Sequence, residues 1–176
     1  MDDRRIAFEA LFAEQHSAVL RYVQRRVDDR EQARELTMDC FEIAWKKFDQ
    51  NAPFRRPWLL KTARNLIGDS YRKRDRERDG FRDLVSASTA PDAAFDNVEL
   101  HVALRQLPAA ERELLELFYW DGLSATEIAE VVGCRTSAAW KRLSRAREAL
   151  RTLLEAPQAP TSATPAGKSH SGVVSP

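Results

Sequence analysis

Apolar residues recur at the spacing of an amphipathic α-helix along most of this chain. In the first half, this pattern predicts helices over residues 6–27, 31–48 and 58–78. Polar loop residues separate these segments, and Pro57 favours the start of the third helix, because proline is tolerated at the first helical position. The apolar arc of the middle helix is wide, so we expect its neighbours to enclose most of it.

The second half predicts shorter helices, with a closely spaced pair at its end. Residues 96–107 and 109–120 each show a short amphipathic pattern. Ser124 and Glu127 then have the spacing of a capping box, which predicts the start of a third short helix. Gly133 stands where that helix must end, because glycine adopts the left-handed cap conformation at little cost.

The last predicted helix runs to about Leu154, with Thr136 or Ser137 as its N-cap. Its inward positions are small or apolar, and they are Ala139, Leu143, Ala146, Leu150 and Leu154. Its remaining surface is basic, through Arg135, Lys141, Arg142, Arg145, Arg147 and Arg151. Two helices joined by a tight glycine turn, the second strongly basic, are typical of a helix-turn-helix DNA-binding motif. A helical hairpin with a solvated cationic face is the alternative.

The helical pattern is interrupted once in the middle of the chain and ends before the C-terminus. Residues 80–95 show no helical spacing of apolar residues and are rich in Ser, Thr, Ala and Pro, so we interpret them as a flexible linker. Residues 156–176 are rich in Pro, Ser and Thr and are predicted to form a disordered tail. The expected fold is all-α, with two small helical domains, 1–79 and 96–155, the second containing the helix-turn-helix.

The overall charge is close to neutral, but the basic residues concentrate in two stretches. There are 28 Lys and Arg against 27 Asp and Glu, for a formal net charge of +1. Local basic patches in a near-neutral chain suit a protein that binds both DNA and another protein. The N-terminus is too charged for a signal peptide and no apolar run reaches membrane-spanning length, so we expect a cytoplasmic protein without membrane insertion.

Candidate catalytic and metal-binding residues are few and scattered. Cys40 and Cys134 lie on different predicted elements, without a CxxC or Cys/His cluster, so we expect neither a metal site nor a disulfide. The three histidines also share no element. Because no nucleophile with a base and no Gly-rich phosphate loop stands out, we predict no catalytic residue, no cofactor and no enzyme activity.

Two segments of the chain together resemble the two conserved segments of one known protein family. The C-terminal segment begins at Ala103 with ALRQLPAAERELLELFYWDGLSATEIAEVVG and ends in RLSRAREALR. The N-terminal segment reads ELTMDCFEIAWKKFD, followed by FRRPWLLKTARNLIGDSYRK. Together they cover roughly residues 8–152, in the order of that family. These segments resemble the extracytoplasmic-function (ECF) sigma factors of bacterial RNA polymerase. The resemblance implies a two-domain initiation factor that brings the polymerase core to promoters and melts the DNA.

One strip of the helix over residues 31–48 is acidic, and periodicity alone favours an ordinary solvated strip. The resemblance reverses this preference, because the family docks this strip on the clamp helices of the largest core subunit. The polymerase-binding residues that it implies are Glu35, Met38, Asp39 and Glu42. Met38 stands where the family usually has glutamine. The acidic charges of the strip are kept, but a methionine side chain cannot make the hydrogen bond of that glutamine.

The helix over residues 58–78 and the segment before it are basic, with aromatic residues among the cations. Basic side chains hold phosphates and aromatics can stack on unpaired bases, although Trp58 is more easily explained as a core residue. In the family this helix reads the minus-ten element, which implies DNA-binding roles for Arg55, Arg56, Lys61, Arg64, Asn65, Asp69, Arg72 and Lys73. The loop over 49–54 corresponds to the one that captures a flipped base.

The helix-turn-helix of the family reads the minus-35 element. The DNA-binding residues implied there are Arg135, Thr136, Ser137, Ala138, Trp140, Lys141, Arg142 and Arg145. Family members usually carry Pro-x-Gly-Thr-Val-Lys-Ser-Arg at this point, where this chain has RTSAAWKR and keeps only the final arginine, Arg142. Trp140 either packs against the preceding helix or contacts thymine methyl groups. Because RTSAAWKR differs from the usual family sequence, we predict that this chain reads different bases.

Two other classes of protein are the alternatives. A stand-alone helix-turn-helix transcriptional regulator would bind operators without polymerase, but the acidic strip and the N-terminal resemblance speak against it. A nucleic-acid-processing enzyme needs metal-coordinating carboxylates or a nucleophile with its base, and the sequence offers neither. We therefore expect bacterial RNA polymerase core and promoter DNA as partners, with an anti-sigma protein as a further candidate.

Overall fold

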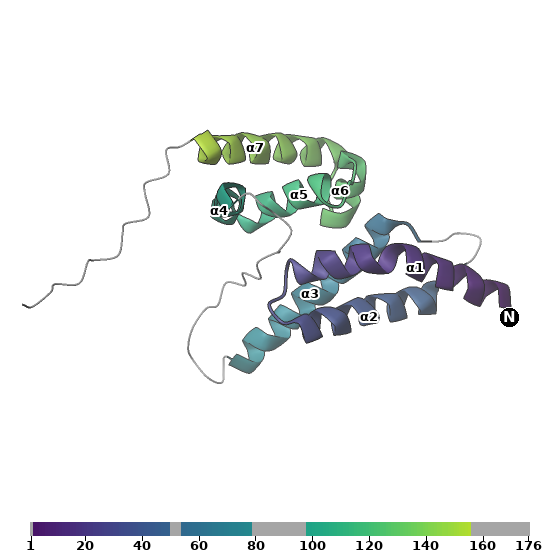
Figure 1. The fold of residues 1–176 in the computed structure, drawn as a ribbon. Helices are drawn as coiled ribbons and strands as arrows, with labels where there is room; N and C mark the ends of the chain where they lie inside the picture. The colour runs from purple at the N-terminus through teal and green to yellow at the C-terminus, as the bar shows by residue number, and fades with distance from the viewer. Residues whose placement is uncertain (1, 50–53, 79–97, 156–176) are drawn as a thin grey trace, which may run out of the picture.

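The structure, a computed structural model, describes residues 2–49, 54–78 and 98–155. Within these ranges the secondary structure consists of seven α-helices (Figure 1). They are α1 (Asp2–Gln24), α2 (Arg30–Lys47), α3 (Arg56–Arg78), α4 (Val98–Gln106), α5 (Ala109–Tyr119), α6 (Ala125–Val132) and α7 (Thr136–Glu155). The all-α prediction is therefore confirmed, and the predicted bounds agree with the observed ones to within about four residues.

Some sequence predictions fall on residues that the structure does not describe. These are the linker over 80–95, the tail over 156–176 and most of the loop over 49–54. Of that loop, only Asp49 and Phe54 are described.

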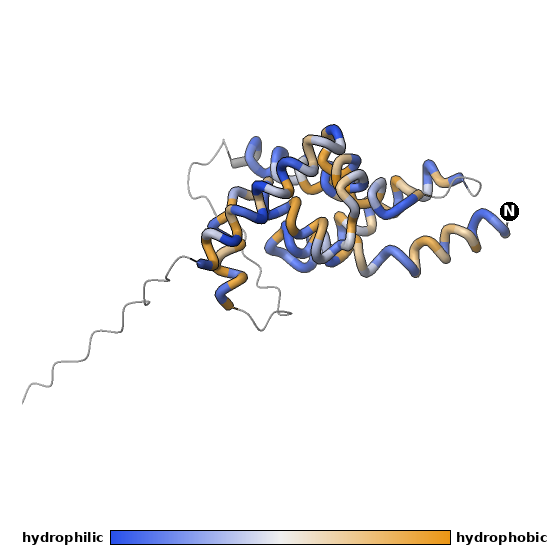
Figure 2. The backbone as a smooth tube through the Cα atoms, turned by 90° about the horizontal axis from the view of Figure 1, so that it is seen from above, coloured by the Kyte–Doolittle hydropathy of each residue, from blue (hydrophilic) through white to orange (hydrophobic). Residues whose placement is uncertain are grey.

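Helices α1, α2 and α3 pack together as an N-terminal unit (Figure 1). α2 begins after Asp29, whose carboxylate accepts a hydrogen bond from the backbone N–H of Glu31 at 2.9 Å. The fully buried side chains of this unit come from all three helices: Val19, Tyr22, Val23, Ala33, Cys40, Ala44, Leu59, Leu60 and Ala63. Figure 2 shows apolar and polar segments alternating along the helices, as expected when each helix turns one face to a core.

The enclosure of α2 is less complete than the sequence predicted. Its buried residues are Ala33, Leu36, Thr37, Cys40, Phe41 and Ala44. Trp45, one of the apolar residues of this helix, is 37% exposed. The guanidinium of Arg4 lies 4.0 Å from the centre of its ring. One side of α2 thus stays open to solvent, where a partner protein can reach it.

Helices α4 to α7 form a C-terminal unit in which α5 and α6 both pack against α7. The predicted capping box is present: Ser124 accepts a hydrogen bond from the N–H of Glu127, whose carboxylate accepts one from the N–H of Ser124. The hydrogen bonds that Ser124 donates lower the pKa of the Glu127 carboxyl, because they favour its charged form. Gly133 has a φ of 74°, which confirms the left-handed end of α6.

Two details of α7 were predicted wrongly. Thr136 is the first residue of the helix and Ser137 lies inside it, so neither is the N-cap. Instead, the carbonyl of Arg135 accepts hydrogen bonds from the N–H groups three and four residues later. Leu154, which we placed on the inward stripe, is 43% exposed near the end of α7.

Cys40 lies in the N-terminal core, and burial raises the pKa of its thiol to about 12.

The described residues hold no group of three or more His, Cys, Asp and Glu side chains that could bind a metal ion. None of the helices in the described ranges is long and apolar enough to span a membrane.

The two units also pack directly against each other, which the sequence did not predict. α6 packs against α3. At the end of α1, the Tyr22 hydroxyl donates a hydrogen bond to the carboxylate of Glu113 on α5 at 3.0 Å. The functional surfaces of the two units therefore have to be considered together.

Candidate functional site

The acidic strip of α2 is open to solvent. Glu35 and Asp39 are exposed on successive turns, and Met38 beside them is 52% exposed. Glu42 follows one turn later and accepts a hydrogen bond from the Lys46 ammonium at 2.6 Å. That hydrogen bond and the lysine charge lower the pKa of the Glu42 carboxyl. A row of carboxylates around an exposed apolar side chain can dock on a basic protein surface.

Most of the residues on α3 and just before it that are predicted to read the minus-ten element are exposed. They are Arg55, Lys61, Asn65, Asp69, Arg72 and Lys73. Asp69 and Arg72 form an ion pair at 2.5 Å across one helical turn. Both side chains of this pair are 67% exposed, so a nucleic acid can reach and replace the contact.

The aromatic residues before α3 are already engaged with one another. The rings of Phe54 and Trp58 stack with their centroids 3.9 Å apart and their planes at 10°. Both side chains are partly buried and pack against the core, which confirms the interpretation of Trp58 as a core residue. One face of each ring is therefore unavailable to a base.

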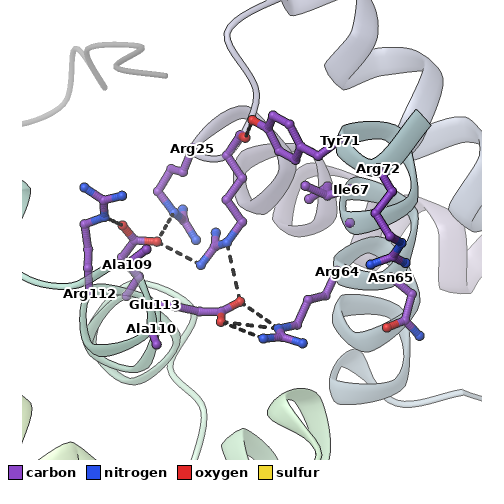
Figure 3. Close-up of a pocket in the computed structure, with 13 residues that line it drawn as sticks. Arg25, Arg64, Asn65, Ile67, Tyr71, Arg72, Ala109, Ala110, Arg112 and Glu113 are labelled. Carbon is purple, nitrogen blue, oxygen red and sulfur yellow. Dashed lines mark hydrogen bonds and ion pairs between the residues drawn. The ribbon is translucent and has the colours of Figure 1, made fainter. Parts of the chain in front are cut away.

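The other two α3 candidates, Arg56 and Arg64, reach the C-terminal unit. Arg56 donates to the Gln15 side chain at 2.9 Å and to the backbone carbonyl of Asp121 at 3.4 Å. Arg64 donates from Nε to the Glu113 carboxylate at 3.1 Å (Figure 3). Desolvation lowers the pKa of the Arg64 guanidinium, but the hydrogen bond and charge of Glu113 outweigh it and raise this pKa overall.

A cavity of about 670 Å³ opens at this junction between the units (Figure 3). Its charged lining comprises Arg25, Arg26, Arg64, Arg72 and Arg112, together with Glu113 and Glu116. The sequence did not indicate Arg25, Arg26, Arg112 or either carboxylate as site residues. The available signals were an Arg-Arg pair at the end of α1 and two glutamates three residues apart on α5, and neither pattern identifies its partner.

The basic face of α7 is free in the described parts of the chain. Arg135, Ser137, Trp140, Lys141, Arg142 and Arg145 are exposed, and Thr136 and Ala138 are partly buried. No carboxylate in the described ranges forms an ion pair with the four basic side chains of this set, Arg135, Lys141, Arg142 and Arg145. Arg147 is different, because its guanidinium lies 4.5 Å from the centre of the Phe118 ring and donates to the Tyr119 hydroxyl.

The sequence left two interpretations of Trp140 open, packing against the preceding helix or contact with thymine methyl groups. Its side chain is 52% exposed on α7 and does not belong to the core. Ala139, next to it, is buried and faces the other helices of the unit. Trp140 is therefore not a core residue, and its contact with DNA stays a prediction.

The structure does not bring the two DNA-binding candidate sets together. Among the described residues, α3 contacts α6 but not α7. The minus-ten and minus-35 candidates are therefore separate surfaces on separate units, as a protein that contacts two promoter elements requires.

Known protein families match both units. The sigma-70 region 2 family matches residues 11–77, and the sigma-70 region 4 family matches residues 97–150. The chain is 31% identical over 157 residues to the ECF RNA polymerase sigma factor SigL of Mycobacterium tuberculosis, covering 81% of this chain and 86% of that one. It is 32% identical over 161 residues to the RNA polymerase sigma factor CarQ of Myxococcus xanthus, covering 87% and 92%.

A solved structure has the same fold. The sigma factor RpoE of Bartonella quintana, crystallised with the anti-sigma factor NepR, aligns with a TM-score of 0.64 and 27% identity. The alignment covers 86% of this chain and 98% of that one. Two matched sigma regions in the right order, relatives matched over most of their length and a shared fold agree with one another: this chain belongs to the family of ECF sigma factors of bacterial RNA polymerase.

Proposed function

We propose that this chain binds RNA polymerase core through Glu35, Met38, Asp39 and Glu42 and directs promoter recognition, DNA melting and initiation. The observation that carries the proposal is the exposed acidic strip of α2 on a chain that also presents an unpaired basic helix-turn-helix. A stand-alone regulator has no evident use for the strip, because carboxylates are repelled by the phosphate backbone of an operator. We also propose that the chain is not an enzyme and works in the cytoplasm, where its polymerase is found.

The work is divided between two domains. Residues 1–79 bind the polymerase and read the minus-ten element along α3, and residues 96–155 read the minus-35 element with α7. Residues 80–95 link the two domains, and residues 156–176 form a tail. An anti-sigma protein is a further proposed partner, supported by the RpoE relative that was crystallised with NepR.

Run-off transcription with purified bacterial core polymerase tests the proposal. We expect the chain plus core to initiate at defined positions on a genomic promoter library, and neither component alone to do so. A chain that binds DNA but never yields core-dependent transcripts would instead be a stand-alone regulator.

Asn65 provides a test of strand opening by α3. Its amide is exposed, so Asn65→Ala should not disturb the core. If the side chain contacts an extruded base, the variant should reduce transcription from closed duplex, with partial rescue on a template already mismatched at the minus-ten element. Run-off transcription from the two templates measures this difference. Equal loss on both would assign Asn65 a structural role, and Lys61→Ala, on an exposed turn of the same helix, serves as a comparison for lost phosphate contact.

A further inference from the structure

The cavity between α3 and α5, at the end of α1, holds more positive than negative charge. Its lining contains the guanidinium groups of Arg25, Arg26, Arg64, Arg72 and Arg112. The carboxylates that pair with these arginines are Glu113 and Glu116 in the lining, and Asp69 and Asp121 outside it. Five guanidinium groups thus face four carboxylates, and the excess positive charge attracts anions to this cavity.

Arg25 carries a buried donor that no described residue accepts. Its side chain is 10% exposed, and one terminal nitrogen binds both oxygens of Asp121 at 2.7 and 2.8 Å. Its Nε is buried without a hydrogen-bond partner among the described residues, because the Glu116 oxygen at 3.8 Å is too far away. A terminal nitrogen of Arg26 lies 2.8 Å from that oxygen, but in a geometry that makes no hydrogen bond. Buried donors without an acceptor cost free energy, so an acceptor that enters the cavity is favoured.

The start of α5 supplies unused donors on one side of the same cavity. α5 begins at Ala109, and Pro108 before it provides no side-chain cap. The N–H groups of Glu111 and Arg112 donate to the carbonyl of Pro108, which leaves those of Ala109 and Ala110 without an acceptor inside the helix. Ala109 and Ala110 both line the cavity, beside Arg112 (Figure 3). Because a helix N-terminus carries partial positive charge, these N–H groups favour an anion here.

The cavity is large enough for a small organic molecule. Its volume of about 670 Å³ lies within the range of about 300–1,000 Å³ that is usual for small-molecule sites. Besides the charged groups, the lining includes the ring of Tyr71 and the aliphatic side chain of Ile67. The donors therefore suit phosphate groups, and the remaining space suits an organic part such as a nucleoside.

We propose that this cavity is a binding site for a small phosphate-bearing anion, of about the size of a nucleoside diphosphate or triphosphate. The Nε of Arg25, the guanidinium of Arg112 and the N–H groups of Ala109 and Ala110 bind its phosphate groups. Arginine and the free N–H groups of a helix start are both strong donors to phosphate oxygens. The binding test needs neither polymerase nor promoter DNA, so its failure would leave the proposed function of the chain untouched.

Isothermal titration calorimetry of the full chain at low salt tests the site with three probes: inorganic phosphate, pyrophosphate and ATP. Pyrophosphate should bind about tenfold more tightly than phosphate, because its second phosphate group reaches additional donors. ATP that binds more tightly than pyrophosphate assigns the site to a nucleotide, and equal or lower affinity assigns it to the oligophosphate itself. Pyrophosphate that binds no more tightly than phosphate, or no binding of pyrophosphate and ATP at millimolar concentration, would overturn the proposal.

The variant Ala110→Glu places a competing carboxylate at the site without a cost to the helix. Ala110 is exposed, and an acidic residue in the first turn favours an α-helix. The new carboxylate repels the anion and competes for the free N–H groups, so the affinity for pyrophosphate should fall at least about tenfold. The matched control is Val98→Glu, which adds the same charge at the first residue of α4, outside the cavity lining, where the side chain is 73% exposed. This control should bind pyrophosphate as wild type does.

Arg112→Gln tests the site by removing a cation. The ion pair of Arg112 with Glu116 spans 3.9 Å and the arginine side chain is 33% exposed, so the fold should survive its loss, which circular dichroism checks. We expect pyrophosphate affinity to fall about tenfold, against no change for Arg105→Gln, an exposed arginine of α4 outside the cavity lining. Unchanged affinity in Ala110→Glu or in Arg112→Gln, each relative to its control, would contradict the proposed site.

A nucleic acid is the other phosphate-bearing molecule that could occupy the cavity. A single-stranded oligonucleotide of randomised sequence is therefore the fourth probe in the same titration. We expect Ala110→Glu and Val98→Glu to bind it equally, because the strand binds to exposed basic faces outside the cavity. A greater loss of oligonucleotide binding than of pyrophosphate binding in Ala110→Glu would overturn the proposal and assign this surface to DNA.

Discussion

Replacing Glu35 and Asp39 with lysine is expected to abolish binding to RNA polymerase core. Both side chains are exposed on α2 and make no ion pair with another described residue, so the helix and its core should be unaffected. Two reversed charges against a basic docking surface cost several kcal/mol, which lowers affinity by a factor of hundreds or more. Co-purification of the variant with core polymerase, alongside its circular dichroism spectrum, measures the effect.

A matched control separates docking from net charge. Glu9→Lys and Glu14→Lys change the chain by the same four charges at exposed positions of α1. This control should still co-purify with the core enzyme. Normal co-purification of the Glu35 and Asp39 variant would show that polymerase docks elsewhere on the chain.

The second large effect is expected in promoter choice. Replacing the start of the recognition helix with the commoner family residues should shift the preferred upstream element and leave core binding intact. The changes are Arg135→Pro, Ser137→Gly, Ala138→Thr, Trp140→Lys and Lys141→Ser. Ala139 is kept, because it is buried and a larger side chain there would strain the packing of the unit.

Selection from promoters with a randomised upstream region compares the two proteins. An arginine that contacts a base contributes about 1–3 kcal/mol of discrimination at one position, so the selected sequences should differ there by tenfold or more in frequency. Arg145→Ala is the comparison for a phosphate contact, and it should weaken all promoters alike and reduce the salt slope by about one unit. Identical selected sequences would place promoter specificity mainly in the N-terminal domain.

Local signals in the sequence were enough to predict the helices and their order. The helical period, the Ser124–Glu127 capping box and the turn at Gly133 each depend on residues within a few positions of one another. Their conformations follow from backbone geometry and nearby hydrogen bonds, and the structure reproduces them. The acidic strip of α2 was also visible, because helical spacing alone places its carboxylates on one face.

Where the local sequence allowed two conformations about equally well, tertiary packing decided which one forms. Thr136 and Ser137 are both good N-caps, yet α7 begins one residue earlier than either choice allows. Trp140 could have packed inward, but the inward positions go to Ala139 and Leu143, which let α6 and α7 approach closely. The N-cap of α7 and the orientation of Trp140 depend on how α6 and α7 cross, and the sequence of one helix does not specify that crossing.

Only the tertiary structure decided the junction between the units. Arg25 and Asp121 are 96 residues apart in the sequence, and Tyr22 and Glu113 are 91 residues apart. An arginine pair and two spaced glutamates occur on many solvated helices, so their sequence neighbourhoods do not identify them as partners. The sequence by itself determined that this chain carries an acidic helix and a basic helix-turn-helix. The packing of α3 against α6 determined that Arg64, a predicted DNA contact, faces the carboxylate of Glu113. The sequence could not show this, because long-range ion pairs form only where folded surfaces meet.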